Sequence, residues 1–122
     1  MKSTKPIYCI YVIELNKKVL EKKKFLKENP NYIDGKPCVY VGYTSRTPEI
    51  RLNQHLNGER NKKGYRLFNR YAHNFGEVLR PSDYKHLNIF MQKKSISKEA
   101  AMSLEVKKAE SLRGKGYAVW QK

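Results

Sequence analysis

The chain is poor in cysteine and contains no long hydrophobic run. Only two of its 122 residues are cysteines, Cys9 and Cys38, and two thiols cannot form a zinc site on their own. We expect both to be small buried hydrophobic residues, because a reducing cytosol opposes a structural disulfide. No apolar stretch approaches the roughly 20 residues that a membrane-spanning helix needs. Residues 1–6 lead into a strand and not into the apolar region of a signal peptide. These absences indicate a cytoplasmic protein.

Acidic residues are also scarce. The chain carries 11 Asp and Glu against 26 Lys and Arg, which gives a formal net charge of +15 at pH 7. On a chain of this size such a surplus produces a positive potential over much of the surface. The usual partner of such a surface is the phosphate backbone of a nucleic acid, whose condensed counterions are released on binding. A membrane surface, or charge that serves solubility alone, would also fit the composition.

The residues that are present suffice for one packed domain spanning 1–122. Hydrophobic residues make up 39% of the chain, with nine Tyr, four Phe and one Trp, which predicts a core and not disorder. Periodicity and capping residues predict, in chain order, strands over 7–15 and 38–43, helices over 48–57 and 65–75, a strand over 86–91, a helix over 98–113 and a closing strand or docked tail over 117–120. Between the first two strands, residues 16–37 are a basic insertion that we expect to project as a loop.

Five side chains spread along the chain could together cut a phosphodiester bond. Tyr11 and Tyr40 lie in the two aromatic strands, and Arg51 and His55 are four residues apart, so they share one face of a helix. Glu105 interrupts the apolar stripe of the last long helix, where a carboxylate must be paired, protonated or bound to a metal. Taken singly, each has an ordinary structural explanation: a core-edge phenol, a solvated helix face, or a glutamate in a helical charge network. The complete ordered set indicates a site.

The order and spacing of these residues resemble the GIY-YIG nuclease family, which is named after its two strand motifs. The motifs here read Cys9-Ile10-Tyr11 and Tyr40-Val41-Gly42. The segment 51–55 is similar to the arginine, three residues and histidine that follow in the family, and 101–105 is similar to its helix that carries the metal glutamate. The resemblance covers nearly the whole chain. It implies an α/β (α+β) domain with a small antiparallel central sheet flanked by helices.

The resemblance also implies a metal-dependent endonuclease that hydrolyses phosphodiester bonds. Glu105 would hold one divalent cation, Mg²⁺ or Mn²⁺, and Arg51 would grip the scissile phosphate. Tyr40 would donate a hydrogen bond to a phosphate oxygen. Tyr11 would orient or deprotonate the attacking water and pass its proton toward His55, which requires a neighbouring cation to depress the pKa of the phenol.

Further residues are candidates for binding the nucleic acid outside the reacting centre. The loop after the second strand offers Tyr43, Thr44 and Arg46, and the insertion offers the run Lys22, Lys23 and Lys24. The partner is DNA or RNA, with no membrane. Family members act in DNA repair, restriction, homing and flap or junction processing, and the sequence does not choose among them. Because the chain has no appended specificity domain, we expect structure-selective or weakly sequence-specific cleavage. The oligomeric state stays open.

The chain departs from the family pattern at two places, and the second departure supports an alternative function. Cys9 replaces the leading glycine of the first motif, and Tyr117 to Trp120 occupy the stretch where many members carry an asparagine after the glutamate. The alternative is a catalytically weak or inactive nucleic-acid-binding module of the same fold. A basic structural or ribosome-associated protein would also fit the charge. Metal-dependent nicking of DNA separates the enzyme from both.

Overall fold

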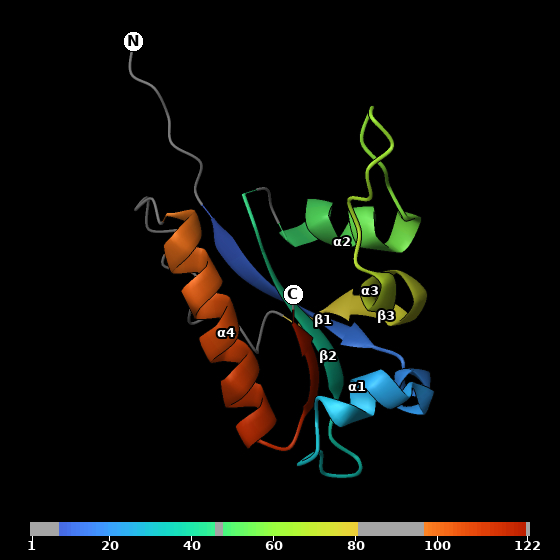
Figure 1. The fold of residues 1–122 in the computed structure, drawn as a ribbon, viewed down its shortest axis with the longest axis vertical. Helices are drawn as coiled ribbons and strands as arrows, with labels where there is room; N and C mark the ends of the chain where they lie inside the picture. The colour runs from blue at the N-terminus through green and yellow to red at the C-terminus, as the bar shows by residue number, and fades with distance from the viewer. Residues whose placement is uncertain (1–7, 46–47, 81–96, 122) are drawn as a thin grey trace.

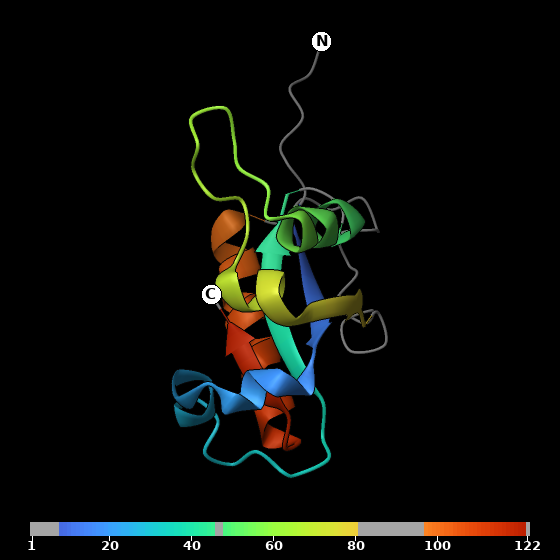
Figure 2. The ribbon, with the colours of Figure 1, turned by 90° about the vertical axis from the view of Figure 1, so that its right-hand side faces the viewer.

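In the part of the chain that the structure describes, a four-stranded sheet lies between two layers of helices. The computed structural model describes residues 8–45, 48–80 and 97–121. Its elements are β1 (Cys9–Leu15), η1 (Lys17–Glu21), α1 (Lys23–Lys27), β2 (Cys38–Thr44), α2 (Pro48–Asn57), α3 (Arg70–Phe75), β3 (Gly76–Leu79), α4 (Lys98–Gly114) and β4 (Ala118–Gln121). Helix α4 covers one face of the sheet, and α1, α2 and α3 lie on the other face (Figures 1 and 2).

The strand order in the sheet is β3-β1-β2-β4. β1 pairs with β2 in antiparallel fashion, as expected from the sequence, and it also pairs with β3 in antiparallel fashion. β4 pairs with β2 in parallel, from Cys38↔Ala118 to Val41↔Gln121, so the predicted helix-flanked sheet is confirmed but is mixed and not purely antiparallel. The reason is the connection: the chain reaches β4 through α4, and a helical crossover can return a strand in the parallel direction.

The two central strands are buried on both faces. In β1 every residue from Ile10 to Ile13 is at most 1% exposed, and Val39 and Val41 of β2 are fully buried. Strands covered by helices on both sides must be apolar throughout and not alternately polar. This burial explains why both strands are recognisable in the sequence as nearly continuous runs of Ile, Val and Tyr.

The segment 16–37 packs against the domain and does not project from it. It forms η1 and α1, and its Val19 and Phe25 are fully buried. The ring of Phe25 stacks against Trp120 of β4 with 6.3 Å between centroids. The expectation of a projecting loop was wrong. Phe25 packs against a residue at the other end of the chain, and no local sequence pattern predicts such a contact.

Asn29 ties this segment to the edge of β4. Its side chain is buried; its Oδ1 accepts a hydrogen bond from Val119 N at 2.7 Å, and its Nδ2 donates to Val119 O at 3.0 Å. Nδ2 also donates to Phe25 O at 2.8 Å. One amide side chain thus satisfies both backbone groups of a strand residue, as a neighbouring strand would.

The middle of the chain differs from the sequence prediction. The helix predicted over 65–75 begins only at Arg70, because Asn69 caps it: its Oδ1 accepts from Tyr71 N and Ala72 N. β3 follows directly at Gly76–Leu79, in a region that the sequence left unassigned. The strand predicted over 86–91 lies outside the described residues.

The last helix was predicted correctly, and the closing segment is a strand, which was one of its two predicted alternatives. α4 begins after Ser97, whose Oγ accepts from Ala100 N at 3.0 Å, and β4 follows it as the closing strand. In the ranges that the structure describes, no helix is both long enough and apolar enough to cross a bilayer.

Replacing Asn29 by Ala is expected to lower the free energy of unfolding by about 2 kcal/mol or more, because the buried N–H of Val119 loses its partner, while the C=O of Val119 keeps only the hydrogen bond from Arg113 Nη2. The control is Asn31→Ala, two residues away at an exposed position, which should change stability by less than about 0.5 kcal/mol. Urea unfolding monitored by circular dichroism measures both. Equal losses in the two variants would contradict the role of Asn29.

Candidate active site

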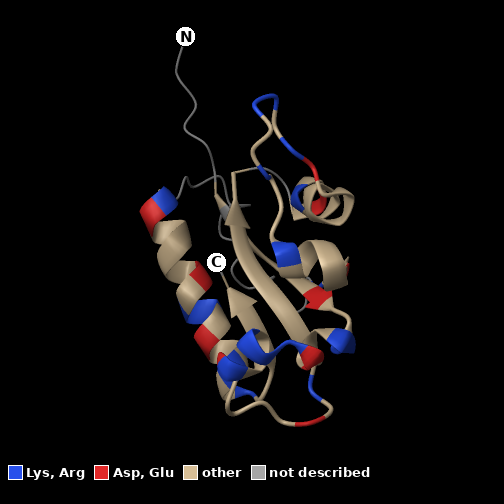
Figure 3. Ribbon diagram, turned by 45° about the vertical axis from the view of Figure 1, so that its right-hand side comes forward, with Lys and Arg blue, Asp and Glu red and all other residues tan. Residues whose placement is uncertain are grey.

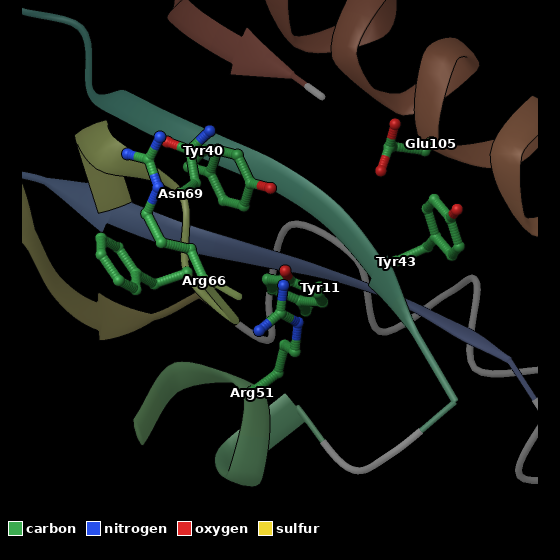
Figure 4. Close-up of a pocket in the computed structure, with 8 residues that line it drawn as sticks. Tyr11, Tyr40, Tyr43, Arg51, Arg66, Asn69 and Glu105 are labelled. Carbon is green, nitrogen blue, oxygen red and sulfur yellow. The ribbon is translucent and has the colours of Figure 1, made fainter. Parts of the chain in front are cut away.

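A cavity of about 320 Å³ opens beside the central strands and gathers side chains from distant parts of the chain. Tyr11 comes from β1, Arg51 from α2 and Glu105 from α4. Among the described residues, the lining consists of Tyr11, Tyr40, Tyr43, Arg51, Arg66, Phe68, Asn69 and Glu105 (Figure 4). Four of the five residues singled out in the sequence therefore border one space. The fifth, His55, lies behind them.

The two tyrosines lie on the same face of neighbouring strands. Tyr11 pairs with Gly42 and Tyr40 pairs with Ile13, so both phenols point to the side on which α2 packs, and their ring centroids are 6.1 Å apart. A Cβ built on Gly42 would overlap the hydroxyl of Tyr11. The glycine of the second motif is therefore needed because the phenol lies directly across its backbone.

His55 is fully buried and forms a hydrogen bond with the hydroxyl group of Tyr11. Its Nε2 lies 2.9 Å from the Tyr11 hydroxyl, and its Nδ1 lies 2.9 Å from the backbone N of Asn69. A backbone N–H can only donate, so Nδ1 must be the acceptor and the proton of the neutral ring must be on Nε2. Burial, and then the charge of Arg51, lower the pKa of His55 to about 3. We infer that His55 is neutral and donates to the oxygen of Tyr11, opposite in direction to the transfer expected from the sequence.

Both phenols are protonated at neutral pH. Burial raises the pKa of Tyr11 well above its usual value, with a further increase from Tyr40, while the positive charge of Arg51 opposes the shift. Burial and the nearby carboxylate of Glu105 raise the pKa of Tyr40 to about 12. Tyr40 is therefore suited to donating a hydrogen bond to an anion in the cavity.

Two hydrogen bonds hold the side chain of Arg51 at the cavity. Its Nη1 donates to Gln54 Oε1 at 2.9 Å and to the carbonyl oxygen of Leu67. In Figure 4 its guanidinium group lies beside the hydroxyl of Tyr11. Arginine has five N–H donors in a planar fork, so these contacts leave donors for a phosphate.

Glu105 enters the cavity from α4 and is only 5% exposed. Its Oε1 accepts from Gln121 Nε2 at 2.9 Å, and the backbone N–H of Tyr43 also donates to the carboxylate. The pairing of β4 with β2 ends at Val41↔Gln121. Two residues further along β2, the backbone N–H of Tyr43 therefore donates to Glu105 and not to β4. Burial raises the pKa of Glu105, and the two hydrogen bonds partly offset the increase.

The donor chemistry at Glu105 suits a hard divalent cation. No Lys or Arg in the described part of the chain forms a salt bridge with this buried carboxylate, and a buried charge requires a counter-charge. The described ranges contain no cluster of three or more His, Cys, Asp or Glu suited to a metal. A bound cation would therefore take most of its ligands from phosphate and water, as Mg²⁺ commonly does.

The structure also places the remaining predicted residues. Tyr43 lines the cavity, whereas Thr44 is 7% exposed and offers little surface to a ligand. Arg46 lies outside the described residues. Lys23 and Lys24 are in α1, directly after Lys22, at the opposite end of the sheet from α2 (Figure 1).

Three residues of the cavity were missed in the sequence. Arg66, Phe68 and Asn69 fell inside a helix that was predicted to start at Tyr65, and so looked like ordinary helical positions. The available signal was Asn69, an N-cap residue type directly before a helical run. Had the helix been started there, Arg66 and Phe68 would have been assigned to the loop that approaches the site.

Comparison with protein families agrees with this geometry. The model of the GIY-YIG catalytic domain matches residues 7–117 of the 122-residue chain. The chain belongs to this family, and its fold is that of a GIY-YIG nuclease. The family supports a function of the nuclease type. Searches of curated proteins and of solved structures found no match.

Gly42→Ala should displace the Tyr11 ring and lower the free energy of unfolding by about 1–3 kcal/mol, because the new methyl group overpacks the core. Gly114→Ala is the control, since a Cβ there meets no atom within 4 Å. Urea unfolding measures the free energy of unfolding of both variants.

The tautomer of His55 is tested by ¹⁵N NMR of its imidazole nitrogens. We expect a protonated Nε2 in the wild type. A protonated Nδ1 would contradict the assignment.

Proposed function

We propose that this protein is an endonuclease that hydrolyses phosphodiester bonds in DNA with one divalent cation, Mg²⁺ or Mn²⁺. Cleavage is structure-selective or weakly sequence-specific. The observation that carries the proposal is the shared cavity, in which Arg51, two buried phenols and a buried carboxylate meet from four different elements. One cationic fork, neutral donors and a site for a cation are the groups that a phosphodiester needs while negative charge builds up on it.

Arg51 binds the scissile phosphate. Its fork matches the geometry of two phosphate oxygens, and its contacts with Gln54 and Leu67 hold the side chain in place before the substrate arrives. Tyr40 donates its O–H to a phosphate oxygen. The raised pKa of Tyr40 keeps that proton in place throughout the neutral range.

Tyr11 orients the attacking water and accepts its proton when ionised. The N–H that His55 directs at the Tyr11 oxygen favours the negative phenolate, as does the charge of Arg51. In this scheme the water proton ends on Tyr11, and the hydroxide attacks the phosphorus held by Arg51. His55 acts through Tyr11 and does not touch the substrate.

Glu105 holds the divalent cation. A cation bound there supplies positive charge to the phosphate and to the leaving oxygen. Gln121 and the backbone of Tyr43 fix the orientation of the carboxylate. The position of the family asparagine is occupied by other residues, but an amide side chain from β4 nevertheless contacts Glu105.

The competing function is a nucleic-acid-binding module without catalysis. The raised pKa values of Tyr11 and Glu105 favour it, because both shifts disfavour the charged forms that catalysis uses. A bound cation beside Glu105 would oppose these shifts. Lys22, Lys23 and Lys24 would serve either function as auxiliary contacts.

Glu105→Gln should reduce metal-dependent nicking of DNA by orders of magnitude, because the metal contributes several kcal/mol to transition-state stabilisation. DNA affinity should remain, since it rests on Lys and Arg over the surface. The control is Glu110→Gln, an exposed position on the same helix. Arg51→Ala should also abolish nicking and weaken binding only modestly. Cleavage assays with Mg²⁺ or Mn²⁺ and anisotropy measurements in EDTA separate the two effects.

Three outcomes would contradict parts of this proposal. Nicking by the wild type in EDTA, or undiminished nicking by Glu105→Gln, would overturn the metal assignment. A wild type that binds DNA but cuts no single-stranded, duplex, branched or RNA substrate would support the binding module instead.

The pH dependence of cleavage tests the roles of Tyr11 and His55. The pKa of Tyr11 is raised, so below it the ionised fraction increases tenfold per pH unit; the pKa of His55 is about 3, so its charge does not change near neutrality. The logarithm of the single-turnover rate should rise with a slope near 1 between about pH 6 and pH 9. A step near the usual histidine pKa that disappears in His55→Gln would instead show that His55 is a base.

A further inference from the structure

Residues 59–67 form a hairpin that stands away from the body of the protein. It lies between α2 and α3 and extends beyond the helices in both views (Figures 1 and 2). Its two arms meet in an antiparallel bridge between Arg60 and Arg66 and in a hydrogen bond from Leu67 N to Glu59 O at 2.8 Å. The sequence pattern did not identify this hairpin.

The tip of the hairpin is internally ordered by Asn61. The Oδ1 of Asn61 accepts from Lys63 N at 2.9 Å and from Tyr65 N at 3.0 Å, and the backbone N of Asn61 donates to Tyr65 O at 2.9 Å. Gly64 adopts a φ of 87°, which an L side chain rarely adopts. Arg60 Nη1 donates to Gly64 O across the turn at 2.9 Å. The tip is therefore shaped before any ligand binds.

The surface of this ordered hairpin is basic and carries an exposed aromatic ring. Its cations are Arg60, Lys62, Lys63 and Arg66, against one acid, Glu59. Basic residues colour its tip in Figure 3. The side chain of Tyr65 is 68% exposed, the largest exposed fraction among the exposed large hydrophobic residues that the structure describes. The ring is therefore accessible to a ligand from solvent.

The hairpin leads directly into the candidate active site. Arg66 and Phe68 line the cavity, and the carbonyl oxygen of Leu67 accepts a hydrogen bond from Arg51. The guanidinium groups of Arg60 and Arg66 each lie 5.9 Å from the centroid of the Phe68 ring. Arg66 therefore connects the cavity that Arg51 lines with the basic hairpin that carries Tyr65.

We propose that this hairpin binds the unpaired part of a branched or flapped DNA substrate, with Tyr65 stacked on an unpaired base. Lys62 and Lys63 contact phosphates beside that base. The proposal rests on the proposed function and gives its substrate class: DNA with unpaired nucleotides next to the bond that is cut.

The exposed aromatic ring is what favours unpaired nucleotides over plain duplex. Basic residues alone would be enough to hold the duplex backbone, but the faces of paired bases are covered by their neighbours in the stack. Aromatic rings interleaved with cations are the usual means of holding single strands, because every base offers a face for stacking. A two-stranded ribbon can also enter the major groove of a duplex, and the experiment must be able to detect that mode.

Binding is measured in EDTA, so that the result does not depend on cleavage. The probes are a flapped duplex with 2-aminopurine in the unpaired arm and a plain duplex of the same sequence. Wild type should quench the 2-aminopurine and bind the flapped probe more tightly. Tyr65→Ala should lose the quench and about 5- to 150-fold in affinity for the flapped probe, since stacking on one base contributes about 1–3 kcal/mol. Tyr65→Phe, which keeps the ring, should behave like wild type.

The lysines are tested by the salt dependence of binding to the flapped probe. Lys62→Ala/Lys63→Ala should reduce the log–log salt slope by about 1.4, or 0.7 for each phosphate on a single strand. The matched control, Lys107→Ala/Lys115→Ala, removes the same charge from exposed positions in and just after α4, on the other face of the sheet. An equal change in both double variants would show a general charge effect and would overturn the proposal for the hairpin.

Other results separate this inference from the proposed function. If wild type cuts DNA but Tyr65→Ala binds and quenches as wild type does, the hairpin proposal is wrong and the nuclease stands. If Tyr65→Ala weakens flapped and plain duplex equally, the hairpin binds a groove and the stacking proposal is wrong. If wild type cuts nothing but Tyr65→Ala loses the quench, the hairpin proposal holds and the catalytic assignment fails.

Discussion

The hydrogen bond between Tyr11 and His55 is the constraint on which the site depends. It joins β1 to α2, and the second ring nitrogen of His55 extends the connection to the start of α3 through the backbone of Asn69. One buried imidazole therefore fixes the positions of a strand and two helices. Because the chain makes this bond with a fully buried pair, Gly42 must carry no side chain, and the phenol can reach the cavity only across that glycine.

The same constraint determines the electrostatics of the cavity. Burial that makes the Tyr11–His55 bond strong also keeps the histidine neutral and the phenol protonated. The formal charges that line the cavity are Arg51, Arg66 and the carboxylate of Glu105. An incoming phosphate and a cation would complement this arrangement, and each would lower the cost of burying the charges already present.

Residues 16–37 and 59–67 both connect regular elements of the described structure, but one packs against the core and the other does not. Residues 16–37 return to the core, since Phe25 has Trp120 to pack against and Asn29 completes the edge of β4. Residues 59–67 stay in solvent, since their order comes from local hydrogen bonds of Asn61 and not from burial. Both segments are rich in lysine and arginine, so composition alone does not distinguish a segment that stabilises the fold from one that presents a surface.

The sequence by itself determined the features that depend on local pattern. These are the two apolar strands, the Ser97 cap and extent of the last long helix, the shared helical face of Arg51 and His55, and the ordered set of five residues that marks the family. The strands, the helix and the shared helical face follow from side-chain periodicity or capping within a few residues, whereas the ordered set follows from its residue types and their order along the chain.

Only the tertiary structure decided the features that depend on partners far apart in the chain. The parallel pairing of β4, the burial of Phe25 and Asn29, and the entry of Arg66 and Asn69 into the cavity all require contacts that no local window contains. The tautomer of His55 belongs to the same group. The backbone N–H of Asn69, which belongs to a different element, donates to Nδ1 and so leaves the proton on the other ring nitrogen. No local sequence pattern shows which donor contacts the ring.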